Sequence, residues 1–185
     1  IQKRISNFCK KNKIQLIIHE NPSFITKKSE LNEFFKKDKK KFFQTSFYKS
    51  QRKKFNILID QNGKPTGGDW TYDVMNREKY PKDKKPPKIE FTGVNDKLFS
   101  ESINFINTNY SQNPGIIGAK FIYPTDHKSA KLWFLRFLKD RFNEFGPYED
   151  SIVKEESFLN HSLLSPLINS GLITPEFIVK ESIDF

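Results

Sequence analysis

The most constraining feature of the sequence is a run of apolar side chains at helical spacing that begins at Ser129 and ends at Phe145. This face is wide and holds Leu132, Trp133, Leu135, Phe137, Leu138, Phe142 and Phe145. Gly146 and Pro147 follow, and such a pair ends a helix. The pattern predicts one long helix that needs other elements to cover its apolar face.

Two short helices are predicted after it from their capping residues. Ser165 caps the start of the first, with Pro166 in its first turn, and Gly171 follows its end. Thr174 caps the second, with Pro175 behind it. The chain from about residue 126 onward is therefore predicted to be all helical.

The beginning of the chain has a different pattern. Residues 1–12 place Ile5 and Phe8 on one helical face, and the run from Ile14 to Ile18 predicts a short, buried strand. A helix followed by a buried strand and a loop is typical of an α/β sheet. Because one strand cannot form the sheet that it implies, we expect its neighbours upstream, which indicates that the chain is a fragment.

Between these parts lie weaker helical patterns and long irregular segments. Helices are predicted over residues 29–37, 41–55 and 94–109, and a brief extended run over 57–60 ends in the turn Gln61-Asn62-Gly63. We therefore expect an α/β part over residues 1–60, an interdomain connection over 61–125 and a helical part over 126–185.

Charge is distributed unevenly along the chain. Residues 1–90 hold 23 Lys and Arg against 10 Asp and Glu, whereas residues 91–185 hold 9 against 12. The basic excess, in the runs 36–41, 49–54 and 79–88, would attract nucleic acid or another polyanion. Lysines outnumber arginines 27 to 5, so a compositional bias that places solvated lysines on the surface explains the charge equally well.

Composition excludes several classes of protein. A single cysteine, Cys9, rules out an internal disulfide framework and a cysteine-based zinc or iron–sulfur site within this chain. No apolar stretch is long enough to span a membrane, and we expect a cytoplasmic protein. His19 and His127 lack the further ligands of a metal site, so no metal is assigned. Cys9 lies on the apolar side of its helix and is expected to be buried.

Two stretches carry a resemblance to a known family. The first runs from Gly63-Lys64-Pro65-Thr66-Gly67-Gly68-Asp69-Trp70 to Asn76-Arg77. The second joins Phe145-Gly146-Pro147-Tyr148-Glu149-Asp150 to His161-Ser162-Leu163-Leu164-Ser165-Pro166-Leu167 and Gly171-Leu172-Ile173-Thr174-Pro175. In this order and spacing they resemble the bacterial cryptochrome/photolyase-related proteins of the iron–sulfur, (6-4) photolyase-like branch, and the resemblance extends over nearly the whole chain.

The resemblance implies a fold and an activity. It implies the C-terminal part of a Rossmann-like α/β antenna domain, a linker, and the first helices of an all-α domain that binds FAD. It also implies light-dependent repair of ultraviolet-damaged DNA, with a lumazine-type antenna and an iron–sulfur cluster whose ligands lie outside this chain. A cryptochrome-type blue-light receptor is the alternative, and a basic nucleic-acid-binding module without chemistry is a third. The fragment alone is expected to be inactive and to hold FAD weakly.

The resemblance also assigns a cofactor site but no catalytic residue within the chain. The matching segment, whose backbone and hydroxyls bind the flavin phosphates, is His161, Ser162, Leu163, Leu164 and Ser165, with Tyr148 preceding it. The residues support an anion site independently, because backbone N–H groups are unpaired where a helix begins. An ordinary Ser-Pro helix cap is the competing interpretation of Ser165.

Other residues have structural interpretations beside functional ones. Asp73 and Arg77 are four residues apart, so a helical turn would pair them; anchoring the connection is the alternative. Arg52 is a candidate anchor between domains. Trp70 and Trp133 are expected to be structural, Trp133 as part of a helical core.

Overall fold

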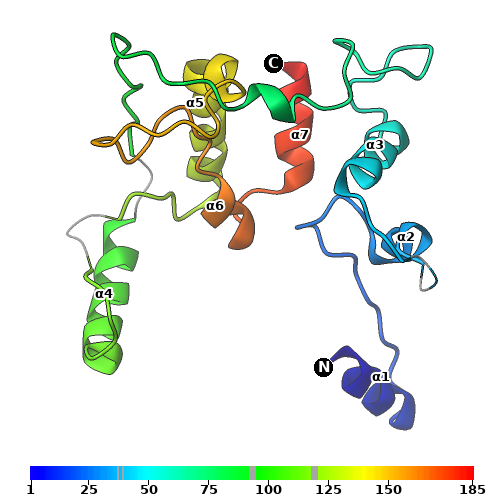
Figure 1. The fold of residues 1–185 in the computed structure, drawn as a ribbon. Coiled ribbons are helices and arrows are strands. Elements are labelled where there is room, and N and C mark those ends of the chain that lie inside the picture. Colours follow the sequence, from blue (N-terminus) through cyan, green and yellow to red (C-terminus); the bar gives the residue numbers. More distant parts are fainter. Residues whose placement is uncertain (37, 39, 92–94, 118–120) are drawn as a thin grey trace.

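The structure is a computed structural model that describes residues 1–36, 38, 40–91, 95–117 and 121–185. These residues form α-helices and one short 3-10 helix, joined by long irregular segments (Figure 1). The elements are α1 (Gln2–Lys11), α2 (Lys28–Phe34), α3 (Gln44–Lys54), η1 (Asp73–Met75), α4 (Asp96–Tyr110), α5 (His127–Phe145), α6 (Ser165–Asn169) and α7 (Pro175–Asp184). Each predicted helix is thus confirmed within a few residues; Val94, at the expected start of α4, and Gly118 and Lys120, in the loop after it, lie outside the described residues.

The predicted α/β fold is wrong. The described residues contain no strand or sheet, and their β-type pairing is limited to an isolated antiparallel bridge between Ile59 and Pro65. The run from Ile14 to Ile18, predicted as a buried strand, is irregular, and Ile17 is 66% exposed. A strand needs a neighbour that pairs with its backbone N–H and C=O groups, and no described segment pairs with this run. The chain is therefore not a Rossmann-like domain, while the domain limits at residues 60 and 125 stay predictions.

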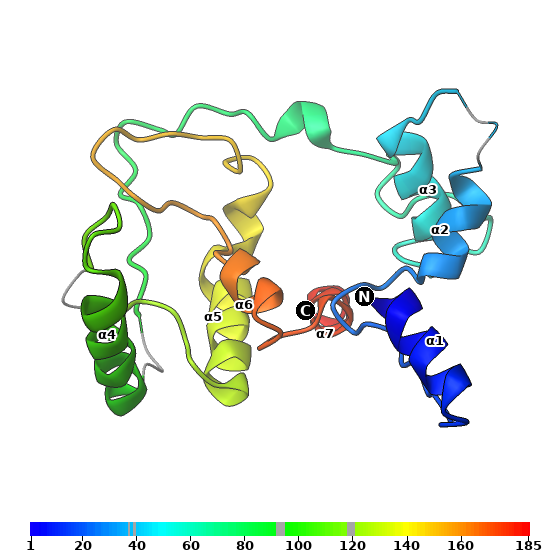
Figure 2. The same cartoon turned by 90° about the horizontal axis from the view of Figure 1, so that it is seen from below.

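A hydrophobic core is built on α5, as the apolar spacing predicted. α6 and α7 lie beside α5 in two perpendicular views (Figures 1 and 2). Leu132 and Leu135, predicted for the same face, are largely exposed instead. Full burial of one large apolar side chain stabilises a fold by roughly 1.5–3 kcal/mol, so this core dominates the stability of the helical part. Its buried members are Ala130, Trp133, Phe134, Phe137, Leu138, Leu164, Leu167 and Ile173.

Side-chain caps fix the starts of α5 and α7. Asp126 caps α5: one carboxylate oxygen accepts the Ser129 N–H at 2.9 Å and the other accepts the Ser129 hydroxyl at 2.8 Å. These hydrogen bonds lower the pKa of Asp126. The predicted cap of α7 is confirmed, since the Thr174 hydroxyl accepts the Phe177 N–H at 3.3 Å. The sequence prediction did not identify Asp126 as the cap of α5, and it placed the start of the helix at Ser129, two residues after the observed start.

Residues 44–72 are organised around a buried arginine rather than an apolar core. Arg52, on α3, is 5% exposed. Its guanidinium donates to the carbonyls of Leu58 at 2.8 Å, Trp70 at 2.9 Å and Ile57 at 3.2 Å, and lies 5.4 Å from the centre of the Trp70 ring. Arg52 therefore fastens the segment around Trp70 to α3; its role as an anchor between domains stays a prediction.

A glycine turn follows the bridge between Ile59 and Pro65. Gly67 and Gly68 have φ angles of +89° and +96°, which side-chain-bearing residues rarely adopt. A Cβ on Gly67 would also lie 2.7 Å from the Tyr72 hydroxyl, which donates to the Gly67 carbonyl at 2.7 Å. The turn is therefore closed by a contact that only glycine permits.

The chain as a whole is open. It exposes 15252 Å², whereas a compact protein of its mass, 21.8 kDa, would expose about 9300 Å². The segments α1 to α3 lie on one side of the α5–α7 group and α4 on the other (Figure 2). None of the described helices is both long enough and apolar enough to cross a membrane.

Candidate functional site

The predicted phosphate-binding segment forms a sharp turn before α6. Leu163 has a φ of +57°, and Leu164 returns to right-handed helical angles with φ −86° and ψ −17°. Consecutive residues of opposite hand direct their backbone N–H groups into one concavity, which is a recognised anion-binding arrangement. Within the described chain, the N–H groups of Ser162, Leu163 and Leu164 donate to no protein acceptor.

The turn is strained and its strain is compensated by packing. A branched residue with a positive φ costs roughly 1–2 kcal/mol. Leu164, the next residue, is 6% exposed and belongs to the core beside α5. Burying Leu164 therefore offsets the cost at Leu163, and strain held in this way is common where backbone geometry serves binding.

The carbonyl side of the turn faces α5. Trp133 donates its indole N–H to the Ser162 carbonyl at 3.2 Å, and Arg141 donates Nε–H to the His161 carbonyl at 3.4 Å. Both side chains are 5% exposed. Trp133 was predicted only as part of the core, and its burial is confirmed. Arg141 was not predicted as a site residue. Its position four residues after Phe137, on the apolar face of the helix, was a signal that it is buried.

Ser165 does not cap α6, so that prediction is wrong. The capping position is Leu164, and no side-chain hydrogen bond caps this five-residue helix. Among the described residues, the hydroxyls of Ser162 and Ser165 have no hydrogen-bond partner; Ser162 is partly buried and Ser165 exposed. Both hydroxyls are thus available beside the turn.

His161 links the turn to the segment after α5. The Leu159 N–H donates to Nδ1 at 3.2 Å, so the proton of the neutral ring is on Nε2, which donates to the Glu149 carbonyl at 3.1 Å. Both ring nitrogens are therefore occupied by backbone groups.

Tyr148 packs against the lysine-rich connection. Its ring lies 5.0 Å from the Tyr80 ring, and the Lys84 ammonium lies 5.1 Å from its centre. Lys84 also pairs with Glu144, whose other oxygen accepts the Asn160 amide N–H at 3.2 Å. The Lys84 hydrogen bond lowers the pKa of Glu144, with a smaller contribution from Asn160. The structure therefore does not bring Tyr148 together with the other predicted site residues.

The connection is fastened to the segment after α5 by polar contacts. Arg77 pairs with Asp150 at 3.2 Å, so the predicted pairing of Arg77 with Asp73 is wrong. The Asn76 side-chain amide N–H donates to the Glu149 carboxylate at 3.0 Å, and the Asn76 backbone carbonyl accepts the Asp150 N–H at 3.1 Å. These partners are 73 or 74 residues apart, and no sequence signal pointed to them.

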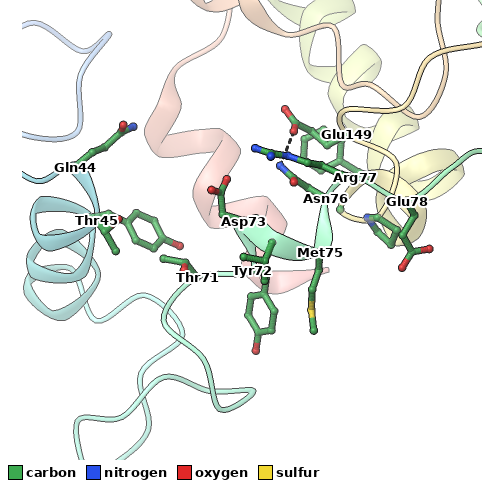
Figure 3. A pocket seen from close by; sticks show the side chains of 15 residues that line it. Gln44, Thr45, Thr71, Tyr72, Asp73, Met75, Asn76, Arg77, Glu78 and Glu149 are labelled. Carbon is green, nitrogen blue, oxygen red and sulfur yellow. Dashed lines mark hydrogen bonds between the residues drawn. The ribbon is translucent and has the colours of Figure 1, made fainter.

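A hollow of about 1120 Å³ lies beside these contacts. α3, the segment through η1 and the residues after α5 line it, and the Asn76–Glu149 hydrogen bond crosses one side (Figure 3). Its lining includes none of residues 161–165. Across the described ranges, no group of three or more His, Cys, Asp or Glu side chains converges as metal ligands would.

Comparison with known proteins identifies the family. The model of the family "Deoxyribodipyrimidine photo-lyase-related protein" matches residues 1–121. The chain belongs to this family. The photolyase-related family predicted from the sequence motifs is thereby confirmed, although its α/β fold is not found in the described chain.

The chain is also similar to three individual proteins. The chain is 29% identical to a (6-4) photolyase of Agrobacterium fabrum over 161 residues, 86% of this chain and 31% of that protein. It is 40% identical over 84 residues to one uncharacterized protein of Acanthamoeba polyphaga mimivirus, and 49% identical over 37 residues to another. The chain spans 31%, 42% and 29% of the lengths of these three relatives.

Proposed function

We propose that this chain is part of a light-dependent flavoprotein that repairs ultraviolet-induced pyrimidine lesions in DNA, and that residues 161–165 bind the phosphates of FAD. Family membership and similarity to a (6-4) photolyase support the activity. The observation that carries the cofactor site is the turn at Leu163 and Leu164: Leu163 has a left-handed φ, and within the described chain the N–H groups of both residues donate to no protein acceptor.

The residues of the turn fit a phosphate group. The N–H groups of Ser162, Leu163 and Leu164 and the hydroxyls of Ser162 and Ser165 are hydrogen-bond donors, and phosphate oxygens are acceptors. The carbonyls of His161 and Ser162, which would repel an anion, already accept hydrogen bonds from α5. A bound flavin would supply the light-driven redox chemistry, and this segment would hold and orient it.

His161 and Tyr148 have supporting roles in this proposal. His161 holds the turn against the Glu149 carbonyl. Tyr148 stacks on Tyr80 and thereby joins the segment after α5 to the connection. The flavin site is then coupled to residues 76–84 through protein contacts rather than through a direct contact of Tyr148 with the cofactor.

Damaged DNA is the proposed partner of the basic part of the chain. The excess of 13 positive charges in residues 1–90 provides electrostatic attraction to phosphate groups. Repair of a base within a duplex also requires the damaged nucleotides to leave the stack. The loop Asn113–Gly118, of which Gly118 lies outside the described residues, is the proposed second element beside the duplex.

The test of the cofactor site is a double substitution in the full-length protein. Ser162→Ala with Ser165→Ala should weaken FAD binding about tenfold, because two hydroxyl hydrogen bonds of roughly 0.5–1.5 kcal/mol each are lost. The matched control is Ser111→Ala with Ser157→Ala, which removes two exposed hydroxyls elsewhere. Flavin absorbance and fluorescence titration measure the binding; an affinity equal to that of the control would overturn the assignment.

The test of the activity is illumination of the flavin-loaded protein with an oligonucleotide that contains a defined pyrimidine lesion. Light-dependent loss of the lesion is the expected result. A protein that binds flavin but leaves the lesion intact in the light would contradict repair and favour a blue-light receptor.

A further inference from the structure

We propose that Trp133 and Arg141, two buried side chains of α5, are positioning residues for the phosphate-binding turn. The inference rests on the proposed function, because it concerns how residues 161–165 are shaped for the phosphates of FAD. Neither side chain is part of the turn, and each contacts it through one backbone carbonyl.

The peptide bond is planar, and its planarity fixes the relative directions of neighbouring backbone groups. In a trans peptide unit, the C=O of one residue and the N–H of the next point in opposite directions. Arg141 holds the His161 carbonyl toward α5, so the Ser162 N–H points away from α5. Trp133 holds the Ser162 carbonyl toward α5, so the Leu163 N–H also points away. The two donors on α5 therefore set the direction of two N–H groups of the turn.

The Trp133 side chain is fixed in place. Its ring is 5% exposed and lies 5.7 Å from the Phe91 ring and 5.8 Å from the Tyr123 ring. Indole has one donor and no acceptor, and that donor is used for Ser162. A phenylalanine at this position would preserve the aromatic packing and lose only this hydrogen bond.

Arg141 is a buried cation without a carboxylate partner. It is 5% exposed, its guanidinium lies 5.5 Å from the centre of the Phe137 ring, and no carboxylate of the described chain forms a salt bridge with it. Burial lowers its pKa, but an arginine stays protonated in proteins. An unpaired buried charge is unfavourable for folding alone, whereas a positive charge behind the turn favours an anion in front of it.

The experiment separates phosphate recognition from flavin binding in general. The full-length protein, freed of flavin, is titrated with FAD and with riboflavin, which has the same ring system but no phosphate. Trp133→Phe and Arg141→Met are each expected to lower the preference for FAD over riboflavin about fivefold, the effect of one hydrogen bond. Arg141→Lys, which retains the charge, should recover part of the preference.

Matched controls come from the same helix. Phe142→Leu changes aromatic packing against Phe137 and Phe185, and Lys139→Met removes one exposed positive charge. Both controls are expected to leave the ratio of the two affinities unchanged. A merely structural role of Trp133 and Arg141 would lower both affinities together and leave that ratio unchanged as well, and this result would overturn the inference.

The double serine variant distinguishes failure of the inference from failure of the proposed function. If the serine variant reduces the preference for FAD but Trp133→Phe and Arg141→Met do not, the phosphate site stands and the positioning role is wrong. If the serine variant has no effect on the preference, or if the unmodified protein has none, the phosphate site itself is wrong and both proposals fall.

Discussion

Residues 1–72 and residues 126–185 have similar numbers of large apolar side chains but use them differently. In the later region eight buried apolar residues form one cluster, supplied by α5, by α6 and by the residues that directly precede α6 and α7. In the earlier region the buried side chains among the described residues are Cys9, Arg52 and Pro65, while Phe24 and Phe43 are 69% and 63% exposed.

The difference shows that apolar content alone does not make a core. A helix face is buried when a neighbouring element lies against it, and the caps and the turn after α5 bring α6 and α7 to that position. In the earlier region α2 contacts α3, with the Phe34 and Phe47 rings 5.0 Å apart, but neither ring is fully buried. A charged side chain, Arg52, holds the segment that follows α3 through backbone carbonyls. The later region is therefore stabilised by a buried apolar cluster, and the earlier one by partly exposed ring contacts together with polar contacts.

The largest expected effect is the loss of a core side chain. Phe134 is 0% exposed, so Phe134→Ala should lower the free energy of unfolding of the helical region by about 3–5 kcal/mol. The matched change Phe24→Ala, at a 69% exposed position, should alter it by less than about 0.5 kcal/mol. Urea unfolding followed by circular dichroism measures both. Equal losses would show that the two regions do not differ in packing.

An intermediate effect is expected from Arg52. Arg52→Met keeps an unbranched apolar stem but removes the guanidinium and its four hydrogen bonds, and should destabilise residues 44–72 by about 3 kcal/mol. Lys53→Met is the control, because the Lys53 side chain is exposed and its ammonium lies over the Trp70 ring at 5.1 Å without a hydrogen bond to the described chain. Amide hydrogen exchange should rise around Trp70 in the Arg52 variant and stay unchanged in α5. Faster exchange in α5 as well would mean that the two regions unfold together.

Local signals in the sequence predicted the helices correctly. The predicted α/β fold class was wrong because it depended on a strand partner that is distant in sequence. The period of α5 and the cap at Thr174 depend on residues within a few positions of one another, and both are confirmed. The run from Ile14 to Ile18 has the composition of a buried strand, but a strand also depends on a partner that the pattern cannot specify. The same limit applies to Arg77, which pairs with Asp150 across 73 residues instead of with nearby Asp73.

The candidate site, like the fold, was predictable in its local features but not in those that depend on tertiary contacts. The motif identified residues 161–165, but the helix start at Ser165 suggested a cap that is absent. The left-handed angle at Leu163 could not be anticipated, because leucine rarely adopts it. It depends on the burial of Leu164 and on contacts with α5, which are tertiary properties.

The smallest expected effect concerns the basic run 79–88, which lies between the two compared regions. In the run 79–88, four lysines are exposed, whereas Lys84 is partly buried and paired with Glu144. Substituting the four exposed residues by alanine should weaken binding to duplex DNA about tenfold if they contact phosphates. They are Lys79, Lys82, Lys85 and Lys88.

The salt dependence of binding decides whether those lysines act through phosphate contacts. The slope of log K against log salt concentration should fall by roughly 0.9 for each contact removed. The control removes the same net charge from four exposed lysines of the later region and should change the slope little, because that region is acidic overall. Equal changes in the two variants would mean that total charge, rather than the position of the basic run, determines DNA binding. The control substitutions are Lys128→Ala, Lys139→Ala, Lys154→Ala and Lys180→Ala.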